Sequence, residues 1–451
     1  MSLSRRLLPF VLALCAGAPA HAEQEPVLPA AELVAPALLA GPGYRVEARA
    51  EVRGYQARFR LHTPWGELQA ESVEMLAIRV GEMPALEALY SESVGETLRA
   101  SGLEAVAAPV KAIANVASHP VQSVVGLPQG VLRYFGERLS KLGAQARKLG
   151  HRIDERISHE GSPYQEVDGP LAATRDPTPA EDRPWWDKPA RELGRLIKNE
   201  AGYGKARREI AERLGVDPYT SNPLLKERLD ALAWAASSGK LGINQALALA
   251  TGGASEVLGY VQQVDRLVLT MAPEDVRARN EDQLARVCAD EELRYAFLHK
   301  GTYTPTLQTA LVDLLVGLRP AGGCEAFLET ALMAASEVEA RFVVNSLRLL
   351  DHYLRDEAHG GHFVPVGALP AYLTRGGEFV LPLPVDYLSW TPQIRQWFDR
   401  PGIGDRRYRT LLVSGRLSPR SERMLTRRGW SLVPHVRYAG APPYVASPVS
   451  P

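Results

Sequence analysis

Hydrophobic and polar residues alternate with a period of two between positions 44 and 70. From 44 to 53 every second residue is apolar or small and the residues between are charged, and the pattern resumes at 55–62 after Gly54. Such alternation is typical of strands that bury one face. A Pro-Trp-Gly turn then precedes a third short strand at 67–70. We therefore predict a small antiparallel β-meander, which needs a helix packed on it to be stable.

Apolar residues at helical spacing dominate most of the chain that follows. Asn222 before Pro223 is typical of a helix start, and Gly215 is typical of a helix end. The expected helices are 72–90 with a break at Pro84, 95–156 with interruptions at Pro120 and Pro128, one that ends at Gly215, one that begins at Pro223 and continues to 236, and helices at 281–299, 306–318 and 325–355.

Short strands are expected again in the last hundred residues. They cover 363–369, 379–383 and 410–413, and a helix at 419–428 and a strand at 430–436 follow. The last strand, helix and strand predict a compact βαβ unit. The fold class that we predict is α+β and predominantly helical, with a small N-terminal antiparallel β-meander and a short C-terminal strand–helix–strand unit.

The first 22 residues have the pattern of a secretory signal peptide. Arg5 and Arg6 precede an apolar run that ends at Gly17, and an Ala-His-Ala cleavage site follows. We expect a periplasmic or secreted protein with no transmembrane segment after signal cleavage. The expected division is a signal peptide at 1–22, a flexible arm at 23–42, a β-meander plus basic amphipathic helices at 43–157, a Pro-rich linker at 158–189, a helical domain at 190–356, and a mixed α/β segment at 357–451.

Charge and cysteine content narrow the choice of function. The 52 basic residues (Lys and Arg) equal the 52 acidic ones, so any electrostatic function must be local. A nucleic-acid partner is not expected for a secreted protein.

Two cysteines, Cys288 and Cys324, remain once Cys15 leaves with the signal peptide. In an oxidising compartment this pair predicts a disulfide, and the alternative is two buried thiols.

Residues 111–152 form a basic segment within this neutral chain, with seven basic residues against Glu137 alone. Aromatic and aliphatic residues separate the charges, a composition that favours an anionic membrane surface. The alternative is a helix that packs on the β-meander with its basic face in water. The predicted membrane-surface residues are Arg133, Arg138, Lys141, Arg147 and Lys148.

Three of the ten histidines lie within eleven residues of one another, at positions 352, 359 and 362. His352, His359 and His362, with Glu357, are candidate ligands for zinc. Their spacing fits no metal-binding motif, and two glycines at 360 and 361 favour the simpler interpretation of a helix that ends there. Apart from this zinc, no cofactor is expected.

Eight arginines occur between 406 and 428, on either side of Ser414. Guanidinium groups suit phosphate or carboxylate ligands, and Ser414 follows a predicted strand at the edge where open α/β sheets bind ligands. A solvated helix face explains the same arginines.

Two functional hypotheses follow. The first is a non-enzymatic structural or interaction protein that associates with a membrane surface or an envelope partner. The alternative is a metal-dependent hydrolase of an envelope substrate that uses the histidine cluster. No catalytic motif decides between enzyme and binding protein.

Overall fold

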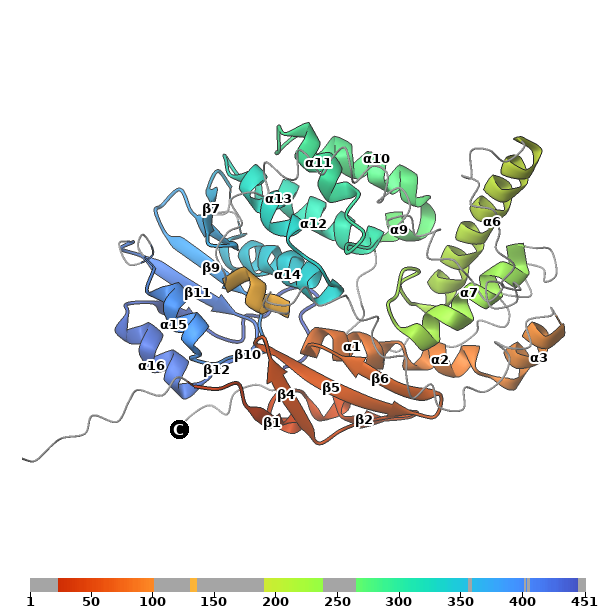
Figure 1. Ribbon diagram of the computed structural model, residues 1–451, viewed down its shortest axis with the longest axis horizontal. Helices are drawn as coiled ribbons and strands as arrows, with labels where there is room; N and C mark the ends of the chain where they lie inside the picture. The colour runs from red at the N-terminus through yellow and green to blue at the C-terminus, as the bar shows by residue number, and fades with distance from the viewer. Residues whose placement is uncertain are drawn as a thin grey trace, which may run out of the picture.

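The computed structural model (Figure 1) describes residues 23–100, 130–135, 190–237, 265–355, 359–400, 403 and 406–444. The expected signal peptide and Pro-rich linker lie outside these residues, as does most of the basic segment. An antiparallel N-terminal sheet, a C-terminal sheet and a majority of helical residues confirm the α+β class. Among the described residues, no helix combines the length and the apolar character needed to cross a bilayer.

The N-terminal sheet contains the predicted meander. Its strands are β1 (Val27–Pro29), β2 (Ala40–Gly41), β3 (Tyr44–Val46), β4 (Arg49–Arg53), β5 (Gln56–Thr63) and β6 (Gly66–Ala70). The order is β1-β4-β5-β3-β2, and β6 also pairs with β5, all antiparallel. Val46 pairs with Leu61, whereas Val52 pairs with Ala57, so two extra residues form a bulge between β3 and β4. This bulge divides the single strand expected at 44–53.

The expected arm at 23–42 is an ordered part of the fold. It contains β1, β2 and two 3-10 turns at Ala30–Glu32 and Pro36–Leu38. Leu33 and Leu38 are buried, and this burial holds the segment in place. The Glu23 backbone N–H donates to the Trp390 carbonyl at 3.1 Å, so the arm also reaches the C-terminal part of the chain.

Helices α1 (Val73–Gly81) and α2 (Met83–Leu89) confirm the expected break near Pro84. Ser72 caps α1, because its Oγ accepts from the Met75 N–H at 3.0 Å. Three further helices belong to this part of the molecule, namely α3 (Glu92–Ala100), α6 (Ala190–Leu214) and α7 (Pro223–Ser237). Gly215 follows α6 with a φ of 69°, and the Asn222 side chain caps α7, as predicted.

The next helices differ from their predicted extents. They are α9 (Arg266–Thr270), α10 (Pro273–Leu284), α11 (Glu291–Leu298), α12 (Pro305–Leu318), α13 (Cys324–Leu332) and α14 (Glu337–Leu354). The helix expected at 281–299 is two helices, because Asp290 caps a new start by accepting from the Leu293 N–H at 3.0 Å. Ser336 divides the helix expected at 325–355 in the same way.

The C-terminal sheet has the order β13-β11-β9-β8-β7. Its strands are β7 (His362–Val366), β8 (Leu369–Leu373), β9 (Phe379–Leu383), β11 (Arg409–Val413) and β13 (Ser431–Val433). The last three are parallel to each other, with α15 (Pro392–Phe398) and α16 (Pro419–Arg427) as their connections. The predicted βαβ unit is therefore present as β11-α16-β13, and β9-α15-β11 is a second one. Helices α13 and α14 contact β7, β8 and β9.

Beyond the carboxyl ends of β9 and β11 the chain continues into a second, two-stranded parallel sheet. It pairs β10 (Tyr387–Leu388) with β12 (Arg416–Leu417). Gly415 lies at the bend between β11 and β12, where a Cβ atom would clash with the backbone of Asp386. Only glycine fits this close approach.

The described residues form two hydrophobic cores. One contains the N-terminal sheet with α1–α3, α6 and α7, and the other contains α10–α14 with the C-terminal sheet. Helices α6 and α7 therefore pack with the meander. The expected helical domain at 190–356 does not correspond to a single core.

Candidate functional site

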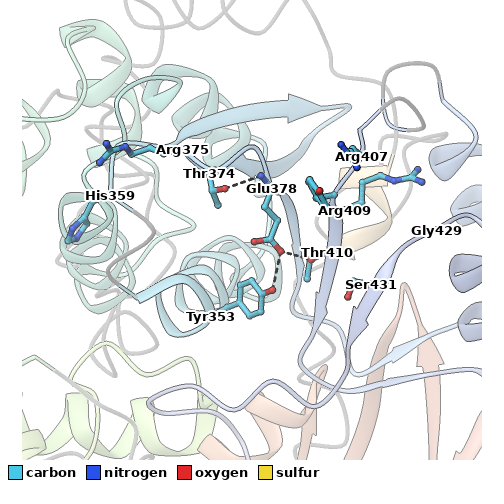
Figure 2. A pocket seen from close by; sticks show the side chains of 12 residues that line it. Tyr353, His359, Thr374, Arg375, Glu378, Arg407, Arg409, Thr410, Gly429 and Ser431 are labelled. Carbon is cyan, nitrogen blue, oxygen red and sulfur yellow. Dashed lines mark hydrogen bonds between the residues drawn. The ribbon is translucent and has the colours of Figure 1, made fainter.

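An open groove of about 940 Å³ lies where the three parallel strands begin (Figure 2). Glu378 directly precedes β9, Arg409 begins β11, and Ser431 begins β13. Because the strands are parallel, their first residues meet at one edge of the sheet. Tyr353 of α14, His359 and Arg375 complete one side, and Arg407 completes the other. Tyr408, next to Arg407 in sequence, also lines the groove.

Glu378 is the one carboxylate among the described residues that line this groove, and hydrogen bonds hold it. Its Oε1 accepts from the Tyr353 hydroxyl at 3.0 Å and from the Thr410 hydroxyl at 2.5 Å. Its backbone N–H donates to Thr374 Oγ1 at 3.0 Å, in the turn that connects β8 to β9. The carboxylate therefore belongs to a fixed polar floor and forms no ion pair with the groove arginines.

The arginines of the groove are of two kinds. Arg409 is anchored, because its Nη2 donates to the Arg428 carbonyl at 2.5 Å and its guanidinium lies 5.5 Å from the Trp430 ring centre. Arg375 and Arg407 are exposed, and neither has a hydrogen-bond or ion-pair partner within the part of the chain that the structure describes. Among the described lining residues, three guanidinium groups against one hydrogen-bonded carboxylate give the groove a positive potential.

Protein fills the carboxyl ends of the parallel strands beside Ser414, the edge at which open α/β sheets bind ligands. Ser414 is buried, and its hydroxyl donates to the Val385 carbonyl at 3.0 Å. Asp386 fixes the N-terminal sheet there, because its Oδ2 accepts from the backbone N–H groups of Ala57 at 2.8 Å and Val73 at 3.0 Å. The Tyr444 hydroxyl donates to Asp386 Oδ1 at 2.6 Å. Burial raises the pKa of Asp386 to about 6, although these three hydrogen bonds act in the opposite direction.

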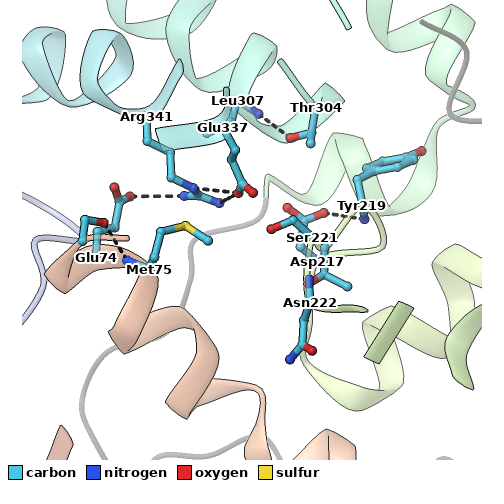
Figure 3. A network of polar contacts seen from close by, with 12 residues as sticks. Glu74, Met75, Asp217, Tyr219, Ser221, Asn222, Thr304, Leu307, Glu337 and Arg341 are labelled. Atoms are coloured by element: carbon cyan, nitrogen blue, oxygen red, sulfur yellow. Dashed lines mark hydrogen bonds and ion pairs between the residues drawn. The ribbon is translucent and has the colours of Figure 1, made fainter. Parts of the chain in front are cut away.

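A second buried polar cluster links α1 to α14 near the loop between α6 and α7 (Figure 3). Arg341 lies between Glu74, at 3.2 Å, and Glu337, at 2.7 Å. Burial opposes the ionisation of Glu337, but the positive charges of Arg341 and Arg79 hold its pKa below the usual value. The cavity beside Glu74 and Asp386 has a volume of only about 10 Å³, which is about the space of one water molecule. This cluster joins elements and leaves no room for a ligand.

The three predicted histidine ligands are not gathered into one site. His352 lies exposed in the last turn of α14, His362 is exposed at the start of β7, and His359 lines the groove. Glu357 lies outside the described residues. Within the described ranges, no three His, Cys, Asp or Glu side chains lie close enough together to hold a metal ion.

Of the predicted membrane-surface residues, Arg138, Lys141, Arg147 and Lys148 lie outside the described part of the chain. The backbone of Arg133 belongs to a 3-10 helix, η3 (Gly130–Phe135). Its neighbours Val131, Tyr134 and Phe135 are buried in the C-terminal core. These apolar side chains of the basic segment therefore pack on protein, in the C-terminal core, whereas the alternative interpretation placed a helix on the β-meander.

The predicted cysteine pair is present. Cys288 and Cys324 lie at disulfide distance, with Cα atoms 5.4 Å apart, and both are buried. They join the loop before α11 to the start of α13.

Sequence patterns identified part of the groove. Arg407 and Arg409 belong to the arginine-rich stretch, and His359 belongs to the histidine cluster. Arg375, Glu378 and Tyr353 were missed, because no spacing along the chain relates them to the other residues.

Comparison with protein-family models, curated proteins and solved structures found no match to this chain.

Proposed function

We propose that the protein is a secreted or periplasmic interaction protein that binds an anionic group of an envelope component in the groove at the amino ends of β9, β11 and β13. The observation that carries the proposal is the pair Arg375 and Arg407. Their exposed guanidinium groups lie on the two sides of one groove and have no acidic partner among the described residues.

The chemistry of the lining suits a phosphate or carboxylate group. Guanidinium groups bind such anions with paired N–H donors and keep their charge at every physiological pH. The hydroxyl of Ser431 and the ring of Tyr408 add a polar donor and an aromatic side chain. Glu378 is held by Tyr353 and Thr410, so the ligand does not have to displace an ion pair from the arginines.

A titration with inorganic pyrophosphate, followed by calorimetry, tests this proposal on the chain from Glu23 onward. We expect saturable binding that weakens as salt is added. The double variant Arg375→Gln/Arg407→Gln should bind at least about tenfold more weakly, since each charged hydrogen bond contributes roughly 1.5–3 kcal/mol.

The matched control is Arg45→Gln/Arg49→Gln, which removes two exposed arginines from the N-terminal sheet. It should leave the affinity unchanged. Equal losses in both double variants, or no binding of pyrophosphate by the unmodified chain, would refute the groove as an anion site.

The hydrolase alternative depends on the histidine cluster, and the described residues offer it no group of metal ligands. We therefore carry only the binding function forward.

A further inference from the structure

The segment of the chain that supplies Arg407, Tyr408, Arg409, Gly429 and Ser431 to the groove is far more basic than the rest of the chain. Between Trp390 and Ser431 the sequence holds ten arginines against Asp399, Asp405 and Glu422, a net charge of +7 in a chain whose total charge is zero. Arg406, Arg407, Arg423 and Arg427 are all exposed. Arg427, in the last turn of α16, precedes by two residues Gly429, which lines the groove. Arg406 and Arg427, which are close in sequence to the groove residues Arg407 and Gly429, therefore extend the positive charge of the groove.

Tyr408 is exposed in the same segment. Its side chain is 56% exposed, the highest value among the large hydrophobic residues that the structure describes as exposed. The Arg407 guanidinium lies 5.4 Å from its ring centre, and Arg409 follows it. An amphipathic aromatic ring flanked by arginines suits the boundary between lipid headgroups and acyl chains.

We propose that this surface, formed by Arg406, Arg407, Tyr408, Arg423 and Arg427 around the groove, docks on an anionic lipid bilayer, with a lipid headgroup as the anion in the groove. The inference rests on the proposed anion-binding function and specifies its ligand. The arginines supply attraction to headgroup phosphates, and Tyr408 enters the interfacial layer.

The composition of the surface favours a lipid over an acidic protein. Stable protein interfaces have a desolvated apolar centre surrounded by a polar rim. Here one exposed aromatic side chain stands among arginines, and the other exposed large hydrophobic residues of the described chain, Val27 and Tyr295, belong to β1 and α11. Charge complementarity with a continuous anionic layer needs no apolar centre.

The test is co-sedimentation with phosphatidylcholine vesicles prepared with and without phosphatidylglycerol. We expect the unmodified chain to bind only the anionic vesicles. Tyr408→Ser should weaken this binding about fivefold, because the ring enters the interfacial lipid layer, and should weaken pyrophosphate binding by less than that. Arg375→Gln/Arg407→Gln should weaken vesicle binding roughly 25-fold, at about fivefold for each arginine.

Tyr295→Ser is the matched control, since Tyr295 is 40% exposed on α11 and lies outside the groove lining. It should leave vesicle binding unchanged. If pyrophosphate binds but anionic vesicles do not, the lipid inference fails and the anion-binding function stands. If neither binds, both fail.

A soluble acidic polypeptide, poly-L-glutamate, separates lipid recognition from attraction to charge alone. Binding of this polymer as tight as binding of the vesicles, with both unaffected by Tyr408→Ser, would overturn the lipid assignment. Loss of both pyrophosphate and vesicle binding in Tyr408→Ser would also overturn it, because the substitution would then be disturbing the groove.

Discussion

Asp386 shows how much one buried residue can organise. Its carboxylate lies at the end of the C-terminal sheet and accepts hydrogen bonds from β5, from the start of α1 and from Tyr444. Three distant parts of the chain therefore meet at two oxygen atoms. Nothing in the local sequence distinguishes this residue from an exposed aspartate in a turn, because its role depends on what packs around it.

We expect Asp386 to make stability depend on pH. Its pKa is about 6 in the folded protein against an ordinary value of 3.8. The protonated carboxyl therefore contributes stability that is fully present below the unfolded pKa and is lost as the pH rises through the folded pKa. Between about pH 4 and about pH 7, the free energy of urea unfolding should fall by roughly 2 kcal/mol more for the wild type than for Asp386→Asn.

Comparison with the variant is essential, because burial also raises the pKa of Asp217, Glu25 and Glu227. Those groups titrate in both proteins, and only the Asp386 contribution differs between them. Parallel pH profiles for wild type and Asp386→Asn would show that Asp386 ionises with its ordinary pKa.

At the scale of elements, η3 explains where the apolar part of the basic segment goes. The ring of Tyr134 stacks on Phe342 of α14 at 5.0 Å, and Phe135 contacts Tyr55 at 5.1 Å and Trp397 of α15 at 6.1 Å. Six residues therefore connect the tip of the N-terminal sheet to two helices of the C-terminal core. An apolar pattern in the sequence shows that a face is covered, but it does not show whether protein or lipid covers it.

Phe135→Ala should lower the free energy of unfolding by about 3–5 kcal/mol, because it opens a cavity in a well-packed core. Chemical denaturation measures this loss, with Tyr295→Ala, at an exposed site, expected to change stability by less than about 1 kcal/mol. Vesicle binding per folded molecule should stay the same. A stable Phe135→Ala variant that no longer binds anionic vesicles would instead place this aromatic residue at the membrane.

On the scale of the whole molecule, the ends of the described chain are joined. Val34 forms a β-bridge with Tyr444, and the Glu23 carboxylate accepts from the Trp390 backbone N–H at 2.8 Å and from the Ser418 hydroxyl at 2.6 Å. Such contacts close very long loops, so they form only when the rest of the fold is in place. They give the N-terminal segment its order, which its composition did not predict.

The cysteine pair also closes a long loop of the chain. Cys288 and Cys324 are 36 residues apart in sequence, and closing a loop of this length in the unfolded chain is worth about 3–4 kcal/mol. We expect Cys288→Ser/Cys324→Ser to lower the free energy of unfolding by that amount. Dithiothreitol should destabilise the wild type similarly and leave the double variant unchanged. Equal stability of the wild type with and without reductant would mean that the pair is not bonded.

The sequence by itself determined the local features of this protein. Alternation predicted the meander, and Ser72, Asn222 and Gly215 mark helix ends because a cap depends only on residues a few positions away. The βαβ unit was also predictable, since its strands and helix follow one another closely. Breaks at Asp290 and Ser336 were missed because an apolar helical pattern continued across them.

The tertiary structure alone decided the candidate site. Parallel pairing brings Glu378, Arg409 and Ser431 to one edge of the sheet, and the N-terminal sheet fills the opposite edge. The three histidines are close in sequence, but they belong to a helix end, a turn and a strand and do not converge. Spacing along the chain controls which side chains share a helix or strand face, whereas convergence of side chains from different elements depends on how those elements pack.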